Sequence, residues 1–414
     1  MVSRYLKITL IFVLILGLTI PIVFFSIYNQ KENEIEITVW YTYEGGDVVE
    51  AIAKEYEEMN PSITINFIVQ PSSGWLDKFI SVAQTGNAPD IFLAKGSWFG
   101  ELAELGYIQP LTNYLTPTDE ARFLSSAING LSYKNELWGI PLWFDSILLF
   151  YNKGLFDAND YPYPQENWTD VEFLDAALNL TDRPDLLYGL SWCTISPYMW
   201  PSFQYGFGHG PLYQEGKIIV NDTASYDAIK YIYDLKWLHR CVYYDDSSSS
   251  ATQAFITNKA AMIIYGGWYI PALNEFDIDY DIEILPTISS TNQRITPMVE
   301  IKGWGMSKDT LYPEICYDII NFLSSKHTQE NLLSQEYKVP TLVEVINSPA
   351  VQNEPLIKKQ IDQIEYSQYY PLDPLYNIYS DFMRAALVFT LINHEEIQQT
   401  LDEAQSNIDA NQGE

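Results

Sequence analysis

Aromatic and polar side chains occur together in four short segments of this sequence, and each segment follows a stretch with the pattern of a buried strand. The segments are 40–44 (WYTYE), 95–98 (KGSW), 143–145 (WFD) and 266–268 (GGW). The rings of Trp and Tyr cover apolar surfaces, while carboxylates and hydroxyls exchange directional hydrogen bonds. A single Trp is commonly part of a core, but four such segments together predict a half-polar binding surface.

The acidic residues near these segments raise the alternative of hydrolysis. Cleavage of a glycosidic bond requires two carboxylates about 5 to 10 Å apart across the bond. Glu44, Asp145 and Glu300 are available, but no two of them form a pair at one strand end. We therefore expect a binding protein that is not an enzyme, with a glycoside hydrolase as the alternative.

The histidines and cysteines predict neither a metal nor a cofactor. Only four His are present, and the three Cys match no metal-binding spacing. Cys193 and Cys241 could form a disulfide or remain free thiols, and the sequence leaves both possibilities open.

The charge of the chain excludes one class of partner. The formal net charge is −31, from 54 acidic and 23 basic residues. Binding to nucleic acid requires clustered Lys and Arg, so we expect no nucleic-acid partner. The acidity also disfavours an acidic ligand, unless a local basic pocket overrides the average.

The N-terminal segment predicts the compartment. Residues 8–28 contain no charge, and at about 1.5 Å per residue they would span about 30 Å, the thickness of a bilayer core. Arg4 and Lys7 before them predict that the N-terminus stays inside and the remainder lies outside. Phe24 and Phe25 stand where a cleavage site should be, so residues 1–30 are expected to form an uncleaved anchor, with a cleaved signal peptide as the alternative.

The elements that would position the four segments follow an alternating pattern. Strand-like runs at 34–40, 63–69 and 89–93 are separated by helical patterns that begin at Asp47 and Trp75. This order predicts right-handed crossovers and a mainly parallel sheet, in which ligands bind beyond the carboxyl ends of the strands. Further along the chain, strands are predicted at 139–142, 147–151 and 260–265, and helices at 168–180, 226–238, 312–324 and 381–391.

From Glu36 onward, the chain resembles extracellular solute-binding proteins of the maltose-binding-protein class, which are partners of ABC importers. The segments that carry the resemblance, in the order of the family, are 37–41 (ITVWY), 86–92 (GNAPDIF), 99–106 (FGELAELG), 138–141 (WGIP), 149–153 (LFYNK), 255–262 (FITNKAAM) and 266–268 (GGW). The resemblance covers almost the whole chain outside the expected anchor.

The resemblance implies an α/β, two-lobed periplasmic-binding-protein-like fold of class II, with a hinge between the lobes and an N-terminal transmembrane helix before them. The first lobe would comprise 34–144 plus 296–326, and the second 145–295 plus 327–414. The chain would therefore cross between the lobes three times.

The resemblance also implies a set of ligand-binding residues in the cleft. Asp145 matches a carboxylate that accepts hydrogen bonds from sugar hydroxyls, and Trp268 matches a stacking residue. Gly266 and Gly267 before this Trp are expected to let the backbone approach a ligand. The complete expected set is Tyr41, Tyr43, Glu44, Ser97, Trp98, Asp145, Tyr198, Trp200, Trp268, Trp304 and Tyr379.

The function implied by the resemblance is that of a monomeric receptor on the outer face of the cytoplasmic membrane, held in the lipid bilayer by its N-terminal helix. It would close around a mono- or oligosaccharide and deliver it to the permease subunits of an ABC importer. The first loop departs from maltose-binding protein, with Tyr-Thr-Tyr-Glu-Gly after Trp40. The ligand class therefore keeps two alternatives, a polyamine and glycerol phosphate.

Overall fold

The computed structural model describes residues 34–42 and 44–411. The expected anchor at 1–30 and the expected site residue Tyr43 lie outside these residues. Within the described part of the chain, no helix has both the length and the apolar character that a membrane span requires.

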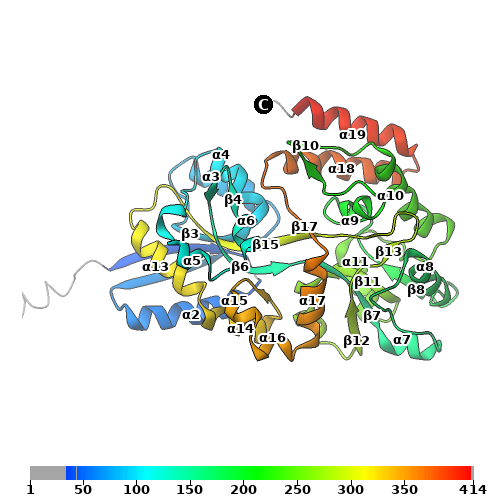
Figure 1. Ribbon diagram of the computed structural model, residues 1–414, viewed down its shortest axis with the longest axis horizontal. Coiled ribbons are helices and arrows are strands. Elements are labelled where there is room, and N and C mark those ends of the chain that lie inside the picture. The colour runs from blue at the N-terminus through cyan, green and yellow to red at the C-terminus, as the bar shows by residue number, and fades with distance from the viewer. Residues whose placement is uncertain (1–33, 43, 412–414) are drawn as a thin grey trace, which may run out of the picture.

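The first lobe is built on a mixed seven-stranded sheet, drawn in the left half of Figure 1. β1 (Ile35–Tyr41), β2 (Ile63–Val69) and β3 (Ile91–Lys95) are parallel, as the alternating sequence pattern predicts, because the helices α2 (Gly46–Met59) and α3 (Trp75–Ala83) make the crossovers. The prediction of a mainly parallel sheet is wrong beyond β3, since β15 (Met298–Met306) is antiparallel to both β3 and β6 (Ile140–Asp145). In spatial order the strands are β16 (Val339–Pro340), β6 (Ile140–Asp145), β15 (Met298–Met306), β3 (Ile91–Lys95), β1 (Ile35–Tyr41) and β2 (Ile63–Val69), and β17 (Gln368–Tyr369) pairs with β15.

The second lobe contains a four-stranded sheet and lies in the right half of Figure 1. Its centre is β11, an apolar run that is buried on both faces of the sheet, as a central strand must be. β11 is antiparallel to β7 and parallel to β8. In spatial order the strands are β12 (Tyr280–Glu283), β7 (Ile147–Asn152), β11 (Ala260–Gly266) and β8 (Tyr188–Ser191).

Helices cover both sheets. Those of the first lobe and its C-terminal return include α4 (Phe99–Glu104), α13 (Pro313–Leu323), α14 (Lys326–Glu336), α15 (Val343–Ile346), α16 (Pro349–Gln352) and α17 (Pro355–Glu365). Those of the second lobe include α8 (Asp170–Asn179), α9 (Trp200–Gly206), α10 (Thr223–Tyr233), α11 (Ser248–Ile256), α18 (Leu375–Leu391) and α19 (Ile397–Asn411). The helix predicted at 226–238 is present and begins earlier, at Thr223, and its last turn, Asp234–Leu238, is a π-helix.

Three strand segments join the lobes. β6 continues into β7 with only Ser146 between them. β15 begins in the second core with Met298 and enters the first core with Val299, and β17 pairs with it at this point. The Ser146 and Ser367 hydroxyls are 3.3 Å apart, so the first and third crossings are also in contact. These three segments form the hinge.

The third crossing lies later in the chain than expected. The resemblance implies that 327–414 belong to the second lobe, but Leu332, Val339, Val351 and Ile357 lie in the core of the first. The reason is long-range packing: β16 extends the first sheet by pairing with β6, and α14 packs against α2. The chain therefore returns to the second lobe only after α17.

The question of the disulfide is settled by the geometry of the thiols. Cys193, Cys241 and Cys316 are all buried and all free. Burial raises the pKa of the Cys241 thiol to about 12, so it behaves as a small apolar side chain.

Candidate ligand-binding pocket

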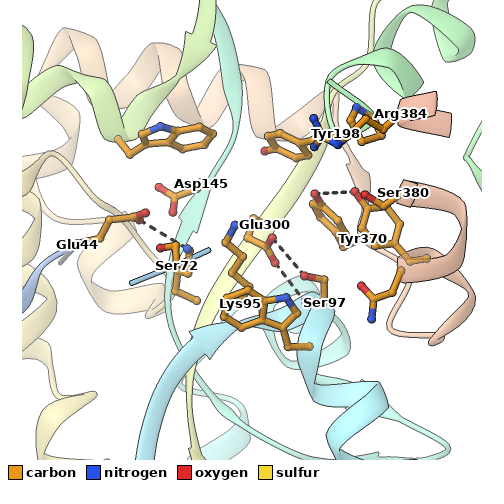
Figure 2. Close-up of a pocket in the computed structure, with 16 residues that line it drawn as sticks. Glu44, Ser72, Lys95, Ser97, Asp145, Tyr198, Glu300, Tyr370, Ser380 and Arg384 are labelled. Carbon is orange, nitrogen blue, oxygen red and sulfur yellow. Dashed lines mark hydrogen bonds and ion pairs between the residues drawn. The ribbon is translucent and has the colours of Figure 1, made fainter. Parts of the chain in front are cut away.

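A pocket with a cavity volume of about 380 Å³ lies between the two lobes (Figure 2). This volume falls within the range of small-molecule sites, about 300 to 1,000 Å³. Three structural regions line it. They are the strand ends of the first lobe, the hinge strands β6 and β15, and, from the second lobe, the turn after β11, the segment before α9 and the helix α18.

The wall from the first lobe is formed where β3 ends. The chain leaves β3 at Lys95 and turns through the short 3-10 helix Gly96–Trp98. The Trp98 ring stacks on Trp75, with centroids 4.9 Å apart and planes 9° apart. Because Trp75 is fully buried, it holds the half-exposed Trp98 ring in place at the pocket.

The wall from the second lobe is a row of four aromatic rings. Trp268 follows β11, and its ring centroid is 6.2 Å from that of Tyr198. Tyr198 stacks on Tyr370 at 5.5 Å, and Tyr370 meets Tyr376 edge-on at 4.6 Å. The Tyr376 hydroxyl donates to the Tyr370 oxygen at 3.0 Å. Burial raises the pKa of Tyr198 and of Tyr370 well above the usual value, so both phenols stay neutral.

The glycines before Trp268 act differently from the sequence-based expectation. A Cβ atom on Gly266 would lie 2.1 Å from the Trp268 ring, and one on Gly267 would lie 2.0 Å from Gln360 Oε1. The first glycine therefore lets the Trp268 ring fold back over the end of β11, and the second allows close packing against α17.

The floor of the pocket is formed by charged residues on the hinge strands. Glu300 of β15 is the register partner of Asp145 of β6, so both carboxylates arise at the point where the chain changes lobe. Asp145 accepts a hydrogen bond from the Trp143 indole at 2.9 Å, and its other oxygen is 3.7 Å from the Lys338 amine. Asp145 is thereby fixed at both of its oxygens.

Glu44 and Glu300 complete the floor. One oxygen of Glu44 is 3.6 Å from the amines of both Lys302 and Lys338. Glu300 accepts hydrogen bonds from the Ser97 backbone N–H at 3.3 Å and, more weakly, from its hydroxyl at 3.5 Å. These contacts, several of them drawn in Figure 2, link the first loop, the strand ends and the hinge in one network.

The lysines set the ionisation of this floor. Burial would raise the pKa of Glu44, but the amines of Lys302, Lys338 and Lys95 outweigh burial and lower that pKa to about 2. Burial would likewise lower the pKa of Lys302, but Glu44, Asp145 and Glu300 raise it above the usual value. The two groups are therefore charged together, and the floor presents donors and acceptors side by side.

Glu300 and Lys95 are less well compensated. Burial raises the pKa of Glu300, against the opposing effect of Lys95 and Lys302. Burial, followed by repulsion from Lys302, lowers the pKa of Lys95. Both groups would gain from additional polar partners in the pocket.

The structure brings six of the expected site residues together at this pocket, namely Glu44, Ser97, Trp98, Asp145, Tyr198 and Trp268. Tyr41 does not line it. The Tyr41 side chain is buried, its hydroxyl donates to Glu50, and its ring packs edge-on against Phe67 at 5.6 Å.

Trp200, Trp304 and Tyr379 are buried in the two cores and do not line the pocket. Trp200 starts α9 and so turns away from Tyr198, two residues earlier. Trp304 pairs with Leu93 of β3, two residues or about 7 Å deeper in the sheet than Lys302, which pairs with Lys95. Tyr379 donates its hydroxyl to the Pro197 carbonyl at 2.7 Å. A ligand-binding role for these three residues is therefore not retained.

Several pocket residues were missed or misjudged by the sequence analysis. Glu300 was considered only as a catalytic acid and Lys302 not at all, although two charged residues alternating in an otherwise apolar strand are a recognisable signal. The residues missed on the second lobe are Tyr370, Asn377, Ser380 and Arg384; Tyr376, which the resemblance implies as a C-terminal aromatic residue of the cleft, also lines the pocket. Except for Tyr370, they share one face of α18, and only the packing of that helix shows that it borders the pocket.

Comparison with known proteins places this architecture in a family. The solved structure of the maltose/maltodextrin-binding domain MalE from Bdellovibrio bacteriovorus, bound to maltotriose, has a TM-score of 0.83 at 22% identity and covers 91% of this chain and 99% of that one. The maltotriose-binding protein of Pyrococcus abyssi is 21% identical over 352 residues, which are 82% of this chain and 74% of that protein.

A bacterial relative and a family match agree with this placement. The maltodextrin-binding protein MdxE of Bacillus subtilis is 23% identical over 369 residues, which are 84% of this chain and 82% of that protein. The family described as "Bacterial extracellular solute-binding protein" matches residues 51–359, more than half of the chain. Members of this family bind a solute and do not transform it. The chain therefore belongs to the bacterial extracellular solute-binding proteins.

Proposed function

We propose that this protein is the carbohydrate receptor of an ABC importer, and that it closes its two lobes around a mono- or oligosaccharide. The observation that carries the proposal is the pocket itself, which combines aromatic rings from both lobes with a floor of carboxylates and amines. The named ligands of the relatives, maltotriose and maltodextrin, support the same class.

The chemistry of the pocket matches that of a sugar. Each sugar hydroxyl both donates and accepts hydrogen bonds, and a floor on which carboxylates and amines alternate can satisfy both needs. The CH face of a sugar ring is apolar and stacks on Trp or Tyr. Micromolar affinity corresponds to about 8 kcal/mol, and two buried aromatic contacts at about 2 kcal/mol each would supply half of it.

The position of the floor couples binding to closure. Asp145, Glu300 and Lys302 lie on β6 and β15, the strands that cross between the lobes. A sugar on this floor touches the hinge directly and meets both walls only when the lobes are together. It shifts the equilibrium towards the closed form to the extent that it binds that form better.

The two alternative solutes receive less support. A polyamine needs unneutralised carboxylates, but Glu44 and Asp145 both lie within 4 Å of a lysine amine. Glycerol phosphate lacks the extended CH face that the row Trp268, Tyr198 and Tyr370 would cover.

A thermal-shift screen tests the proposal. A ligand at 100 times its Kd stabilises the folded state by about 2.7 kcal/mol. We expect at least one saccharide to raise the melting temperature, and spermidine and glycerol 3-phosphate to leave it unchanged. Stabilisation by either of the latter two, without any saccharide, would contradict the proposal.

We also propose that residues 8–28 tether the receptor, as a monomer, to the outer face of the cytoplasmic membrane beside its permease. Their uncharged length and the preceding Arg4 and Lys7 support this arrangement. Membrane fractionation tests it. The full chain should remain with the membrane after an alkaline wash, whereas release of a chain beginning near residue 30 would indicate cleavage.

A further inference from the structure

The charged residues of the pocket differ in whether they have partners. Glu44 and Asp145 lie within 4 Å of lysine amines, and Glu300 accepts from Ser97. Among the described residues, neither Lys95 nor Arg384 has a carboxylate within 4 Å, although both line the pocket. The pocket therefore has no carboxylate free of a polar partner but has two cations available.

These two cations belong to opposite walls. Lys95 ends β3 in the first lobe, and Arg384 lies on α18 in the second, as Figure 2 shows. A negative group that reached both of these cations would contact both lobes at once and would favour the closed form. Arg384 also follows Ser380 by four residues on α18, so a hydroxyl donor lies on the same helix face.

We infer that the saccharide carries a carboxylate, as a hexuronic acid unit does, and that Lys95 and Arg384 hold this group. The inference rests on the proposed function and narrows its ligand class. A carboxylate matches the planar fork of an Arg guanidinium, which can form two parallel hydrogen bonds with it, while Lys acts as a point charge.

The electrostatics of Lys95 support the assignment. Burial and the neighbouring Lys302 lower the pKa of Lys95, and Glu300, Glu44 and Asp145 offset this effect only in part, so the charged amine is incompletely compensated. An anionic ligand would restore that compensation. The net charge of −31 opposes approach from a distance, but salt screens that repulsion beyond about 8 Å at physiological ionic strength.

Calorimetry with matched sugars tests the inference on the full-length protein. The pairs are glucose with glucuronate, galactose with galacturonate, and the neutral and uronate forms of the corresponding disaccharides. We expect at least one uronate to bind tenfold or more tightly than its neutral partner. Arg384→Gln and Lys95→Gln should each remove most of that difference, whereas Lys230→Gln, which changes a lysine on α10 paired with Asp234, should not.

The outcomes separate this inference from the proposed function. If neutral sugars bind as tightly as their uronates, the inference fails and the proposed function stands. If no sugar of either charge binds, both fail. Tighter binding of sugar sulfates or phosphates than of uronates would overturn the assignment of a carboxylate. Because Arg384 is exposed, its variant should fold normally even if the Lys95 variant does not.

Discussion

The two sides of the interlobe pocket are lined by different kinds of side chain. The second lobe contributes a row of rings, from Trp268 through Tyr198 and Tyr370 to Tyr376. The first lobe and the hinge contribute charged groups held by strand register, with Asp145 opposite Glu300. The rings can supply affinity through apolar contacts that do not fix the orientation of a ligand. The charged floor can fix that orientation through directional hydrogen bonds, but its charged groups must lose hydration when the ligand binds. A complete site therefore requires both lobes in their closed arrangement.

The charged floor and the aromatic wall of the pocket are held in place in different ways. Asp145, Glu300 and Lys302 of the floor lie on strands, where pairing with the neighbouring strands fixes the backbone. The aromatic wall depends on contacts between rings and on the Tyr198 hydroxyl, which donates to the Met298 carbonyl at the start of β15 at 3.3 Å. This bond ties the wall to the hinge strand. Substitutions on the two sides should therefore have different signatures.

The largest effect is expected on the aromatic side, from Trp268→Ala. Loss of the half-buried Trp268 ring, which a stacked sugar would cover, should cost about 2 kcal/mol, or about 30-fold in affinity, while the fold stays intact. Calorimetry with the saccharide found in the thermal-shift screen measures this loss of affinity. Trp237→Ala, a half-exposed Trp elsewhere on the second lobe, is the control and should bind normally. An unchanged affinity of the Trp268 variant would remove that residue from the site.

A second prediction concerns Gly100→Ala, a substitution that should hold the lobes apart without changing any residue that lines the pocket. A Cβ atom on Gly100 of α4 would lie 1.6 Å from the carbonyl oxygen of Leu372, in the segment that leads from β17 to α18. Gly100→Ala should therefore hold the lobes apart and weaken binding by about tenfold, about 1.4 kcal/mol. Small-angle scattering of the protein with sugar should show a larger radius than for the parent.

Gly154→Ala is the matched control for that experiment. A Cβ atom on Gly154 would make only an ordinary contact at 3.4 Å, with Asn152. This variant should bind and close like the parent. If Gly100→Ala also closes fully, the contact between α4 and the segment before α18 does not limit closure.

On the charged side, Asp145→Asn should weaken binding by about five- to tenfold. Hydrogen bonds to a charged group are worth about 1.5 to 3 kcal/mol against about 1 for neutral ones, so most of the difference should be lost. The Trp143 bond should survive, because the amide keeps an acceptor oxygen. Equal affinity of the two proteins for the same sugar would show that the charge of Asp145 is irrelevant.

The smallest effect concerns pH and Glu44. The pKa of this group is lowered in the folded protein from 4.5 to about 2, so its contribution to stability is complete above pH 4.5 and is lost as the pH falls towards 2. Its side chain is 30% exposed, so screening limits the effect to about 1 kcal/mol, or about 1 to 2 °C for a protein of this size. The melting temperatures of Glu44→Gln and the parent should differ at pH 7 and converge near pH 2. A constant difference over this range would contradict the assignment.

The sequence predicted the first lobe well where signals are local. Alternating apolar residues in β1 and the helical spacing of α2 are sufficient to identify the first crossovers. The return of 327–357 to the first lobe was missed, because it depends on the pairing of β16 with β6, which no local pattern encodes. Strand existence was therefore easier to predict than lobe membership.

The pocket residues divide in a similar way. Residues at strand ends, such as Asp145 and Trp268, reach the pocket because the strand ends face it. Trp200 and Tyr379 carry similar side chains, but their helices turn them into the core, and composition cannot distinguish the two faces of a helix. Arg384 was missed for the converse reason, since an isolated cation near the C-terminus has no sequence signature.

The most direct test of a two-sided site is a crystal structure of the protein with the saccharide that stabilises it most. The account predicts the sugar between the closed lobes, with a ring stacked on Trp268 or Tyr198 and hydroxyls bonded to Asp145 or Glu44. A saccharide bound outside the interlobe pocket, or held by one lobe alone with the lobes apart, would contradict it.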